Sequence, residues 1–367
     1  MPLKKPGLSF LAPTEEEEEG QNGHTAVNDE PTLMGAAVQS GARPLKSQAS
    51  FTLSSTMTFN QDGITLSGGR GLIEADGAET SSLRLSELER VRRLGSGATS
   101  HVYLCKHRAT GELYAVKELT AMADADTRRM AVNELRIARA ARGEHLIRFV
   151  DAFFDEGKIS IALEFADAGS LDDVIRRSKG IPEPQLSIIT VQMLHGLLYL
   201  HREMHQVHRD LKPANVMLTR RGDVKLSDFG ISKQLESTAA LAITQCGTTM
   251  YMSPERLQGE SYSYVSDVWS AGLIVLEALI GRAPYPAAKS FMGLLCAICD
   301  EEPPQVPATH GAQARAIVAE CLTKDPSCRP KVSVLQQHAW FAEHSGGAEP
   351  AISSAALGGW LVELLLR

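Results

Sequence analysis

The hydrophobic pattern of this 367-residue chain changes twice along its length, and the two changes limit the folds that it can form. Residues 1–85 are rich in Gly, Ser, Thr, Pro and Glu and contain few large apolar side chains. Such a segment cannot bury enough apolar surface to offset its chain entropy, so we expect it to be largely disordered. Short β-rich runs follow, and helical patterns dominate from Ser170 onward. The sequence therefore predicts an α+β fold in two lobes, a small β-rich lobe and then a larger helical one.

Individual segments support this division. Residues 102–119 are two β-rich runs around a Gly-containing turn, which predicts a hairpin, and residues 147–165 predict a second strand pair. Between them, residues 126–141 have the spacing of a helix. In the larger part, residues 183–204 predict a long amphipathic helix, whereas residues 266–281 are apolar on nearly every side and predict a buried helix.

We place the folded domain at residues 86–343, with the smaller lobe at 86–166 and the larger lobe at 167–343. Before the domain, residues 51–66 carry apolar side chains that could dock on the folded body. After it, residues 344–367 form a tail that either packs back on the larger lobe or offers a docking surface to another protein. Four of the tail's apolar residues have helical spacing: Trp360, Leu361, Leu364 and Leu365.

Composition excludes several classes of protein. The formal net charge of −7 gives no support for a nucleic-acid partner, and no apolar run reaches the roughly 18 to 20 residues that span a bilayer. The six cysteines are scattered through a chain with 43% apolar residues, which indicates reduced thiols. Cys296 and Cys299 form a C-x-x-C pair without a second ligand pair, so we interpret them as buried residues on one helix face. We expect a soluble protein inside the cell, without a membrane partner.

A glycine-rich stretch, LGSGATSHV, follows the start of a predicted strand. Gly95 and Gly97 let backbone amides approach a phosphate because no Cβ intervenes, although such turns also occur in ordinary hairpins. Downstream, AVK places Lys117 on a strand among apolar neighbours, where a lysine is costly unless it is paired. Glu134, in the predicted helix, is a natural counter-charge; the alternative is a lysine with its head group in solvent.

The strongest chemical signal is HRDLKPANVML, a polar loop between a predicted long helix and a strand. A carboxylate, a cation and an amide at these offsets can orient a hydroxyl, neutralise a transferring phosphoryl group and ligate a metal. The next strand runs into KLSDFG, where Asp228 offers hard oxygen ligands suited to Mg²⁺. The polar residues of the loop are His208, Arg209, Asp210, Lys212 and Asn215.

In this order, the motifs resemble the signature set of the protein kinases, which also includes the later Ser-Pro-Glu. The resemblance covers roughly residues 88 to 342, and Ser100 stands where the third glycine of the usual loop falls. A later segment with Asp267, Trp269 and Gly272 resembles an element of the larger kinase lobe. The resemblance also implies that Arg329 pairs with Glu255 and braces the activation segment.

The resemblance implies an enzyme that uses ATP and Mg²⁺, and it gives a role to each matched residue. Asp210 would accept the proton of the substrate hydroxyl, Lys212 would stabilise the γ-phosphate charge, and Lys117, paired with Glu134, would hold the α- and β-phosphates. Asn215 and Asp228 would hold the metal. The expected ATP-binding residues are Leu94, Gly95, Ser96, Gly97, Val102, Ala115, Lys117, Leu163, Glu164, Ala166 and Met217.

The segment GTTMYMSPERL resembles the MAP kinase kinases in particular, which implies dual specificity for Thr and Tyr of a MAP kinase activation loop. The hydroxyl-rich residues before it would be this chain's own activation segment, with phosphorylation sites at Thr238 and Thr244. The distance between the two threonines looks like the plant, or green-lineage, type of the family, and Ser237 is a neighbouring alternative. A phosphate adds about −1.5 to −2 charges and could order the segment against Arg209.

The first residues of the chain, KKPGLSFL, resemble the docking motif by which MAP kinase kinases bind their MAP kinase. Lys4 and Lys5 would meet an acidic patch, and Leu8 and Phe10 an apolar groove. The resemblance implies a downstream MAP kinase and an upstream MAP kinase kinase kinase as partners. We expect a location in the cytoplasm, with the nucleus as a second candidate.

Two other interpretations stay open from the sequence. The chain could be another Ser/Thr kinase of the same group, one tier upstream in the cascade. It could also be a non-catalytic scaffold, which predicts damage at Lys117, Asp210 or Asp228, and these three positions are intact.

Overall fold

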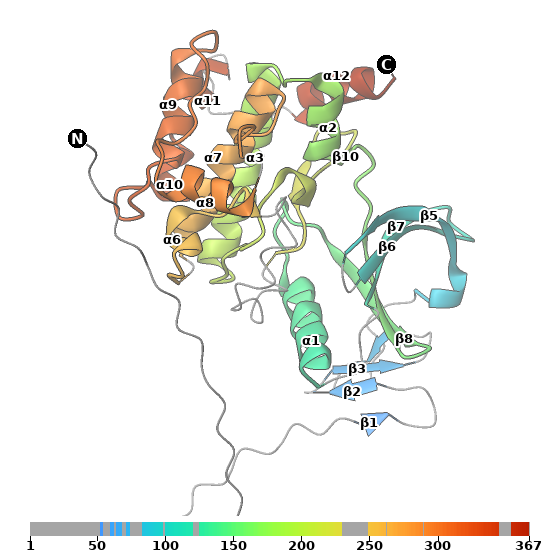
Figure 1. The fold of residues 1–367 in the computed structure, drawn as a ribbon. Helices are drawn as coiled ribbons and strands as arrows, with labels where there is room; N and C mark the ends of the chain where they lie inside the picture. The colour runs from blue at the N-terminus through green and yellow to red at the C-terminus, as the bar shows by residue number, and fades with distance from the viewer. Residues whose placement is uncertain are drawn as a thin grey trace, which may run out of the picture. The chain divides into compact units, whose positions relative to one another are not determined.

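The computed structural model describes residues 52–53, 59–61, 64–67, 71–73, 83–97, 100–119, 125–229, 249–261, 263–288, 290–344 and 354–366. All of them belong to one compact unit, Gln48–Arg367. Figure 1 shows its two parts, a smaller one built around a curved sheet and a larger one built from helices. The α+β fold in two lobes that the sequence predicts is confirmed.

The smaller lobe is a five-stranded antiparallel sheet with one helix, α1 (Ala125–Ala140), against it. The strand order is β5-β6-β7-β9-β8, so each pair of neighbours except β7 and β9 is a simple hairpin. Both predicted hairpins form, and in the first one Gly111 takes the positive φ of 75° that its turn requires. The strands are β5 (Leu88–Ser96), β6 (Ser100–His107), β7 (Leu113–Leu119), β8 (Phe149–Asp155) and β9 (Lys158–Glu164).

Strands β7, β8 and β9 carry buried side chains on both faces of the sheet, since successive side chains of a strand point to opposite sides. On one face, Leu119, Ile159 and Ile161 form a cluster with the apolar side of α1. On the other face, Val116 and Phe153 form a second cluster with residues that include Leu83, just ahead of the 3₁₀ turn Leu85–Glu87.

A second, four-stranded antiparallel sheet lies ahead of the smaller lobe, within the segment that was expected to be largely disordered. Its strands are β1 (Thr52–Leu53), β2 (Phe59–Gln61), β3 (Ile64–Ser67) and β4 (Gly71–Ile73). Ile64 and Leu66 are buried in the same cluster as α1, so the docking expected of residues 51–66 is confirmed for these two side chains. Composition alone could not predict the sheet, because its two anchoring residues become buried only against a surface that residues far along the chain provide.

The larger lobe is helical, with a small antiparallel sheet of order β10-β11-β12 at its edge. The predicted buried helix is α7, where Trp269 is fully buried and Gly281 ends the helix at a positive φ of 67°. The small sheet is made of β10 (Gly169–Ser170), β11 (Val216–Leu218) and β12 (Val224–Leu226), and a 3₁₀ turn, Pro213–Asn215, precedes β11. The helices are α2 (Leu171–Ser178), α3 (Glu183–Arg202), α6 (Pro254–Leu257), α7 (Tyr264–Ile280), α8 (Phe291–Cys299), α9 (Ala312–Cys321), α10 (Val332–Leu335), α11 (Ala339–His344) and α12 (Ser354–Leu366).

The tail helix α12 packs on the larger lobe, as the first of the two alternatives predicted. Leu361 and Leu364 are buried in the large core, and Trp360 and Leu365 are half-buried against it. In Figure 1 this helix lies beside α2, near the C-terminus. Among the helices that the structure describes, none is long and apolar enough to cross a bilayer.

The prediction for the C-x-x-C pair is wrong in one respect. Cys296 is exposed and Cys299 is half-buried, because Leu294 and Ile298 form the buried face of α8 and the two cysteines lie off that face. Within the described part of the chain, no group of three or more His, Cys, Asp and Glu side chains is placed to hold a metal ion.

Candidate active site

A cavity of about 1020 Å³ lies between the sheet of the smaller lobe and the edge of the larger one. Every residue that the sequence predicted for ATP or metal binding lines it, from Leu94 and the glycine-rich loop to Met217, Asn215 and Asp228. Val102 and Ala115 come from neighbouring strands, β6 and β7, whereas Met217 comes from β11 of the larger lobe. The cavity therefore has apolar walls from both lobes and polar groups at one end, as a site for a nucleotide requires.

Lys117 joins three distant parts of the chain at the polar end of this cavity. Its Nζ lies 2.8 Å from Oε1 of Glu134 on α1 and 2.7 Å from Oδ1 of Asp228, which follows β12. The side chains of Lys117 and Glu134 are only 14% and 11% exposed, so the lysine is not the solvent-exposed alternative. The predicted counter-charge is confirmed, and Asp228 is a second one.

Lys117 and Asp228 stabilise each other's charge, whereas burial raises the pKa of Glu134 although Lys117 opposes this. Burial favours the neutral form of Lys117, but Asp228 and Glu134 outweigh it and raise the pKa of the lysine above its usual range. Burial also opposes ionisation of Asp228, yet Lys117 holds the pKa of that carboxyl below its usual value. Lys117 and Asp228 are therefore both charged near neutral pH.

The loop HRDLKPAN, residues 208–215, is called the catalytic loop below. Its residues Lys212 and Asn215 hold Asp210 in place. Lys212 Nζ donates to Oδ2 of Asp210 over 3.0 Å. The amide nitrogen of Asn215 donates to the backbone oxygen of Asp210 over 2.7 Å and to its Oδ2 over 3.1 Å. The carboxylate, the cation and the amide of HRDLKPAN thus lie together, as predicted.

Asp267, at the start of α7, binds the backbone of this loop through hydrogen bonds. Its Oδ2 accepts hydrogen bonds from the backbone N–H of His208 over 2.9 Å and from Nε2 of His201 over 2.8 Å. Its Oδ1 accepts from the backbone N–H of Arg209 over 3.2 Å. Arg209 has a positive φ of 69°, which is costly for a residue with a side chain, so these bonds hold a strained loop. The sequence singled out Asp267 only by resemblance and gave it no role.

The Asp-Phe-Gly motif turns Asp228 toward Lys117 and Phe229 into the core. Phe229 is 3% exposed and lies edge-on to the ring of His208, with the ring centroids 6.5 Å apart. Asp228 has a positive φ of 54°, the second strained position of the site. The buried aromatic side chain therefore fixes the direction in which the acid points.

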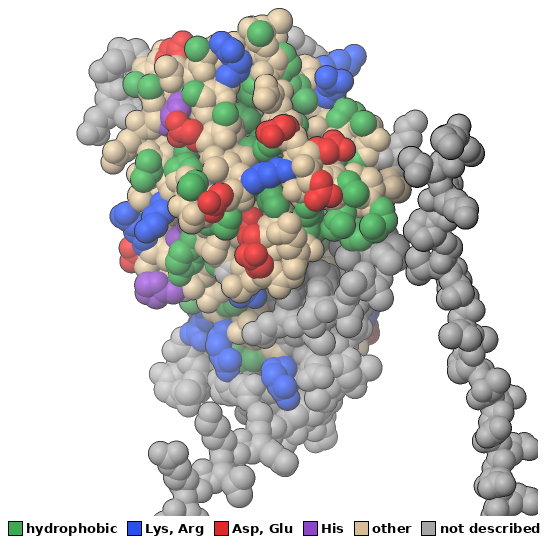
Figure 2. All heavy atoms as spheres, turned by 60° about the vertical axis from the view of Figure 1, so that its left-hand side comes forward, with side chains coloured by type: hydrophobic (Ala, Val, Ile, Leu, Met, Phe, Trp, Pro, Cys, Tyr) green, Lys and Arg blue, Asp and Glu red, His purple; other side chains and the backbone are tan. Residues whose placement is uncertain are grey.

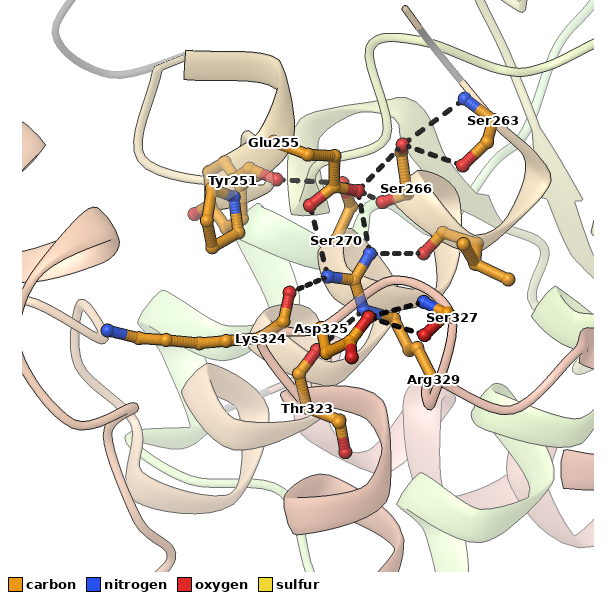
Figure 3. A network of polar contacts seen from close by, with 12 residues as sticks. Tyr251, Glu255, Ser263, Ser266, Ser270, Thr323, Lys324, Asp325, Ser327 and Arg329 are labelled. Atoms are coloured by element: carbon orange, nitrogen blue, oxygen red, sulfur yellow. Dashed lines mark hydrogen bonds and ion pairs between the residues drawn. The ribbon is translucent and has the colours of Figure 1, made fainter. Parts of the chain in front are cut away.

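Arg329 and Glu255 form the ion pair that the resemblance implies, and Figure 3 shows it at the centre of a polar network. Two parallel hydrogen bonds of 2.8 and 3.1 Å join the guanidinium to the carboxylate. Ser266 adds a hydrogen bond of 3.0 Å to Oε1 of Glu255, and Arg329 also donates to the backbone oxygen of Val265. Although burial opposes it, Arg329 lowers the pKa of Glu255, so the pair is charged at neutral pH. Glu255 is the second residue of α6, directly after Ser253 and Pro254.

The donor set fits magnesium, which prefers oxygen ligands and takes one or two carboxylates together with the phosphates of a substrate. The amide nitrogen of Asn215 is engaged by Asp210, so its carbonyl oxygen is the atom oriented for a metal. Asp228 adds carboxylate oxygen at the same cavity.

Other predicted residues lie outside the part of the chain that the structure describes. These are the activation-segment residues Ser237, Thr238 and Thr244 and the docking residues Lys4, Lys5, Leu8 and Phe10. The cavity also contains residues that motif matching did not predict, including Ile147, Asp173 and Leu365 of α12. Leu365 belongs to the helical pattern of the tail, but nothing in that pattern indicates which part of the larger lobe the helix covers.

Comparisons with known proteins agree with this geometry. The sequence profile "Protein kinase domain" matches residues 88–341. The chain is 39% identical over 269 residues to "Mitogen-activated protein kinase kinase 2" of Arabidopsis thaliana, covering 71% of this chain and 74% of that protein. It is 38% identical over 272 residues to "Mitogen-activated protein kinase kinase 1c" of Physcomitrium patens, covering 72% and 79%. It is 37% identical over 292 residues to "Mitogen-activated protein kinase kinase SIPKK" of Nicotiana tabacum, covering 77% and 82%.

The matched profile and the converging site define the chain as a protein kinase, an enzyme that takes its phosphoryl group from ATP. Within that family it belongs to the MAP kinase kinases, of the plant type that the sequence resembles.

Proposed function

We propose that this MAP kinase kinase transfers the γ-phosphoryl group of MgATP to a Thr and a Tyr in the activation loop of a MAP kinase. The observation that carries the proposal is the position of Lys117, within 2.8 Å of both Glu134 and Asp228 in the cavity that the predicted ATP-binding residues line. A scaffold without catalysis has no use for this arrangement, because it places three buried or partly buried charges together without a structural need for them.

Each residue of the site has a task that its contacts support. Asp210, oriented by Asn215 and Lys212, accepts the proton of the incoming hydroxyl. Lys212 is close enough to share its charge between Asp210 and a phosphoryl group beside it. Lys117 is oriented by Glu134 to hold phosphates. Asn215 and Asp228 would hold magnesium, which supplies positive charge to the phosphates when it is bound.

Phosphorylation of Thr238 and Thr244 is the activating step in this proposal. Both threonines lie between Asp228 and the anchored α6, in a hydroxyl-rich stretch with little apolar patterning. Each phosphate adds about −1.5 to −2 charges and can form charge-assisted bonds with a guanidinium such as that of Arg209. The enzyme that adds them is an upstream MAP kinase kinase kinase.

The proposed partners follow from charge and from the N-terminal motif. Lys4, Lys5, Leu8 and Phe10 would bind the MAP kinase through an acidic patch and an apolar groove. Figure 2 shows acidic, basic and apolar side chains interspersed on one face of the larger lobe, without a continuous basic surface among the side chains drawn in colour there. With a net charge of −7, we expect no nucleic-acid partner. We place the protein in the cytoplasm, with the nucleus as a second candidate location, and a fluorescent fusion in living cells would test both.

Phosphate mapping on one substrate tests the activity. A catalytically inactive plant MAP kinase is incubated with MgATP and this protein, and its activation loop is analysed by mass spectrometry. We expect phosphate on both the Thr and the Tyr, and a drop in rate of about 10²- to 10⁴-fold for Asp210→Asn, which cannot accept the proton. Phosphate on Ser or Thr alone would favour a kinase of the upstream tier. No turnover, even for the Thr238→Glu/Thr244→Glu variant, would favour a scaffold.

A second experiment tests the activation step. The wild type, Thr238→Ala and Thr244→Ala are incubated with an upstream kinase, and their activity is then compared, with Ser237→Ala as the matched neighbour. We expect activation to be lost or strongly reduced in each threonine variant and kept in Ser237→Ala. Unchanged activation in both threonine variants would remove these residues from the account.

A further inference from the structure

The sheet ahead of the kinase domain buries two side chains in the core of the smaller lobe. Ile64 and Leu66 alternate along β3, so both point to the same face, and they are 6% and 0% exposed. The two residues between β2 and β3 in the sequence are Asp-Gly, a pair typical of two-residue hairpins, and β3 pairs with β2 and β4 on either side. This strand lies ahead of residues 88–341, the span that the kinase profile matches.

The surface on which these residues dock includes α1. Ile64 and Leu66 belong to one continuous buried cluster with Val132 and Leu135 of α1 and with Phe154 of β8. Figure 1 shows β3 beside the end of α1 and beside β8, and the close approach of β3 and β4 to β8 agrees with that view. The N-terminal sheet therefore packs on β8, and through Ile64 and Leu66 it shares one buried apolar cluster with α1.

The same helix carries a group of the active site. Glu134 lies between Val132 and Leu135 in the sequence, and it leaves the helix in another direction to reach Lys117 over 2.8 Å. A helix held by apolar contacts on one side and by one ion pair on another cannot turn without breaking one of the two. If the apolar contacts are weakened, α1 can move away and leave Lys117 paired with Asp228 alone.

We propose that Ile64 and Leu66 are positioning residues of this kinase, which hold α1 in the orientation that pairs Glu134 with Lys117. The segment ahead of the kinase domain is then needed for tight binding of MgATP and for full activity. This inference rests on the kinase activity proposed above, but not on the identity of the protein substrate.

The first test compares two leucines in the full-length protein. Leu66→Ala truncates a side chain of the buried cluster that includes α1, whereas Leu83→Ala truncates a side chain of the same size that is also buried, on the face of the sheet opposite to α1. The affinity for MgATP is measured by calorimetry without any protein substrate, and a melting curve is recorded for each variant. We expect Leu66→Ala to weaken binding by about tenfold, within the range typical of coupling between two sites, and Leu83→Ala to change it by less than about twofold.

The second test asks whether Leu66 acts through Glu134. In a Glu134→Ala background the ion pair is already lost, so Leu66→Ala should not weaken MgATP binding further. Leu66→Met, which keeps most of the apolar volume, should restore binding in the presence of Glu134. If Leu66→Ala does not fold, Leu66→Val and Ile64→Val replace it in the same comparisons.

Either of two results would overturn the inference. One is an equal loss of affinity in Leu66→Ala and Leu83→Ala, which would show a general loss of stability. The other is a full additional loss when Leu66→Ala is combined with Glu134→Ala. Failure of the proposed protein substrate alone would leave these binding results unchanged, so the two proposals can fail separately.

Discussion

At the scale of single residues, the site depends on acids that serve as hydrogen-bond acceptors for the parts around them. Asp267 is 1% exposed and receives three hydrogen bonds, two of them from the backbone of the catalytic loop. Glu255 has a similar position under the end of the activation segment, where Arg329 and Ser266 bind it. A buried carboxylate is costly unless its oxygens are satisfied, and both residues have their partners.

We predict that Glu255→Gln destabilises the protein strongly. The substitution leaves the guanidinium of Arg329, whose side chain is 0% exposed, without its counter-charge. Removing one partner of a buried ion pair typically costs about 3–5 kcal/mol of the free energy of unfolding. Urea denaturation of Glu255→Gln and of the exposed control Glu260→Gln measures this, and the control should change by less than about 0.5 kcal/mol. Equal effects in both variants would show that the pair contributes little.

At the scale of elements, the tail helix and the small sheet of the larger lobe meet at two glycines. A Cβ on Gly222, in the β11–β12 turn, would lie 1.8 Å from the backbone oxygen of Ser354. A Cβ on Gly358 of α12 would lie 2.7 Å from the backbone oxygen of Arg220. The helix therefore rests directly on the turn between the strand that carries Met217 and the strand that leads to Asp228.

The two adjacent glycines of α12 give opposite predictions. Gly358→Ala forces the helix away from the turn and should destabilise the protein by about 1–3 kcal/mol. Gly359→Ala meets nothing within 4 Å, so it should stabilise the helix by about 0.5–1 kcal/mol through its better helix propensity. Thermal melting of both variants checks this, and a similar shift in both would contradict the close approach.

Elements with a strong local pattern were predictable, and elements that depend on distant residues were not. Helix α7 follows from its apolar sequence alone, and the first hairpin follows from its β-rich runs and its glycine. Strand β3 has the same kind of alternation, but it is short and lies in a polar segment, so only the surface of α1 and β8 makes it a stable site for Ile64 and Leu66. The position of α12 on the β11–β12 turn is likewise invisible in its own sequence.

At the scale of the whole molecule, the active site exists only where the two lobes meet. Lys117 and Asp228 are separated by 111 positions in the sequence, yet Nζ of Lys117 lies 2.7 Å from Oδ1 of Asp228. Their chemical types and order identified them as site residues through the kinase resemblance, but no pattern within either segment gives the distance between them. The separate motifs predicted the ATP-binding residues, whereas the supporting role of Asp267 required the fold.

Glu183 links three parts of the larger lobe, and its contacts predict how stability depends on pH. It begins α3, and it accepts hydrogen bonds from the backbone N–H of Gly311 over 2.8 Å and from the indole of Trp340 over 3.4 Å. His310 and His344 lie within 3.5 and 3.6 Å. Although burial opposes ionisation, the hydrogen bonds from Gly311 and Trp340 lower the pKa of this carboxyl in the folded protein.

The pKa of glutamate in an unfolded chain is about 4.3. Because the pKa of Glu183 is lower in the folded protein, its charge stabilises the fold at pH values above about 4.3. This stabilisation is lost as the pH falls through the pKa of the folded state. We therefore expect Glu183→Gln to be less stable than the wild type at pH 7, with a difference that shrinks steadily below about pH 4.3. Urea denaturation of both proteins at several pH values measures the difference. A difference that does not change with pH would show that the charge of Glu183 contributes nothing.

The central claim is that groups from both lobes form one site for a magnesium-bound nucleotide, and one calorimetric measurement tests it most directly. ATP is titrated into the full-length protein with Mg²⁺ and with EDTA, for the wild type and for Asp228→Asn. We predict that the wild type binds ATP more tightly with Mg²⁺, and that most of this difference disappears in Asp228→Asn. No binding of ATP, or the same affinity with and without Mg²⁺ in the wild type, would contradict the account.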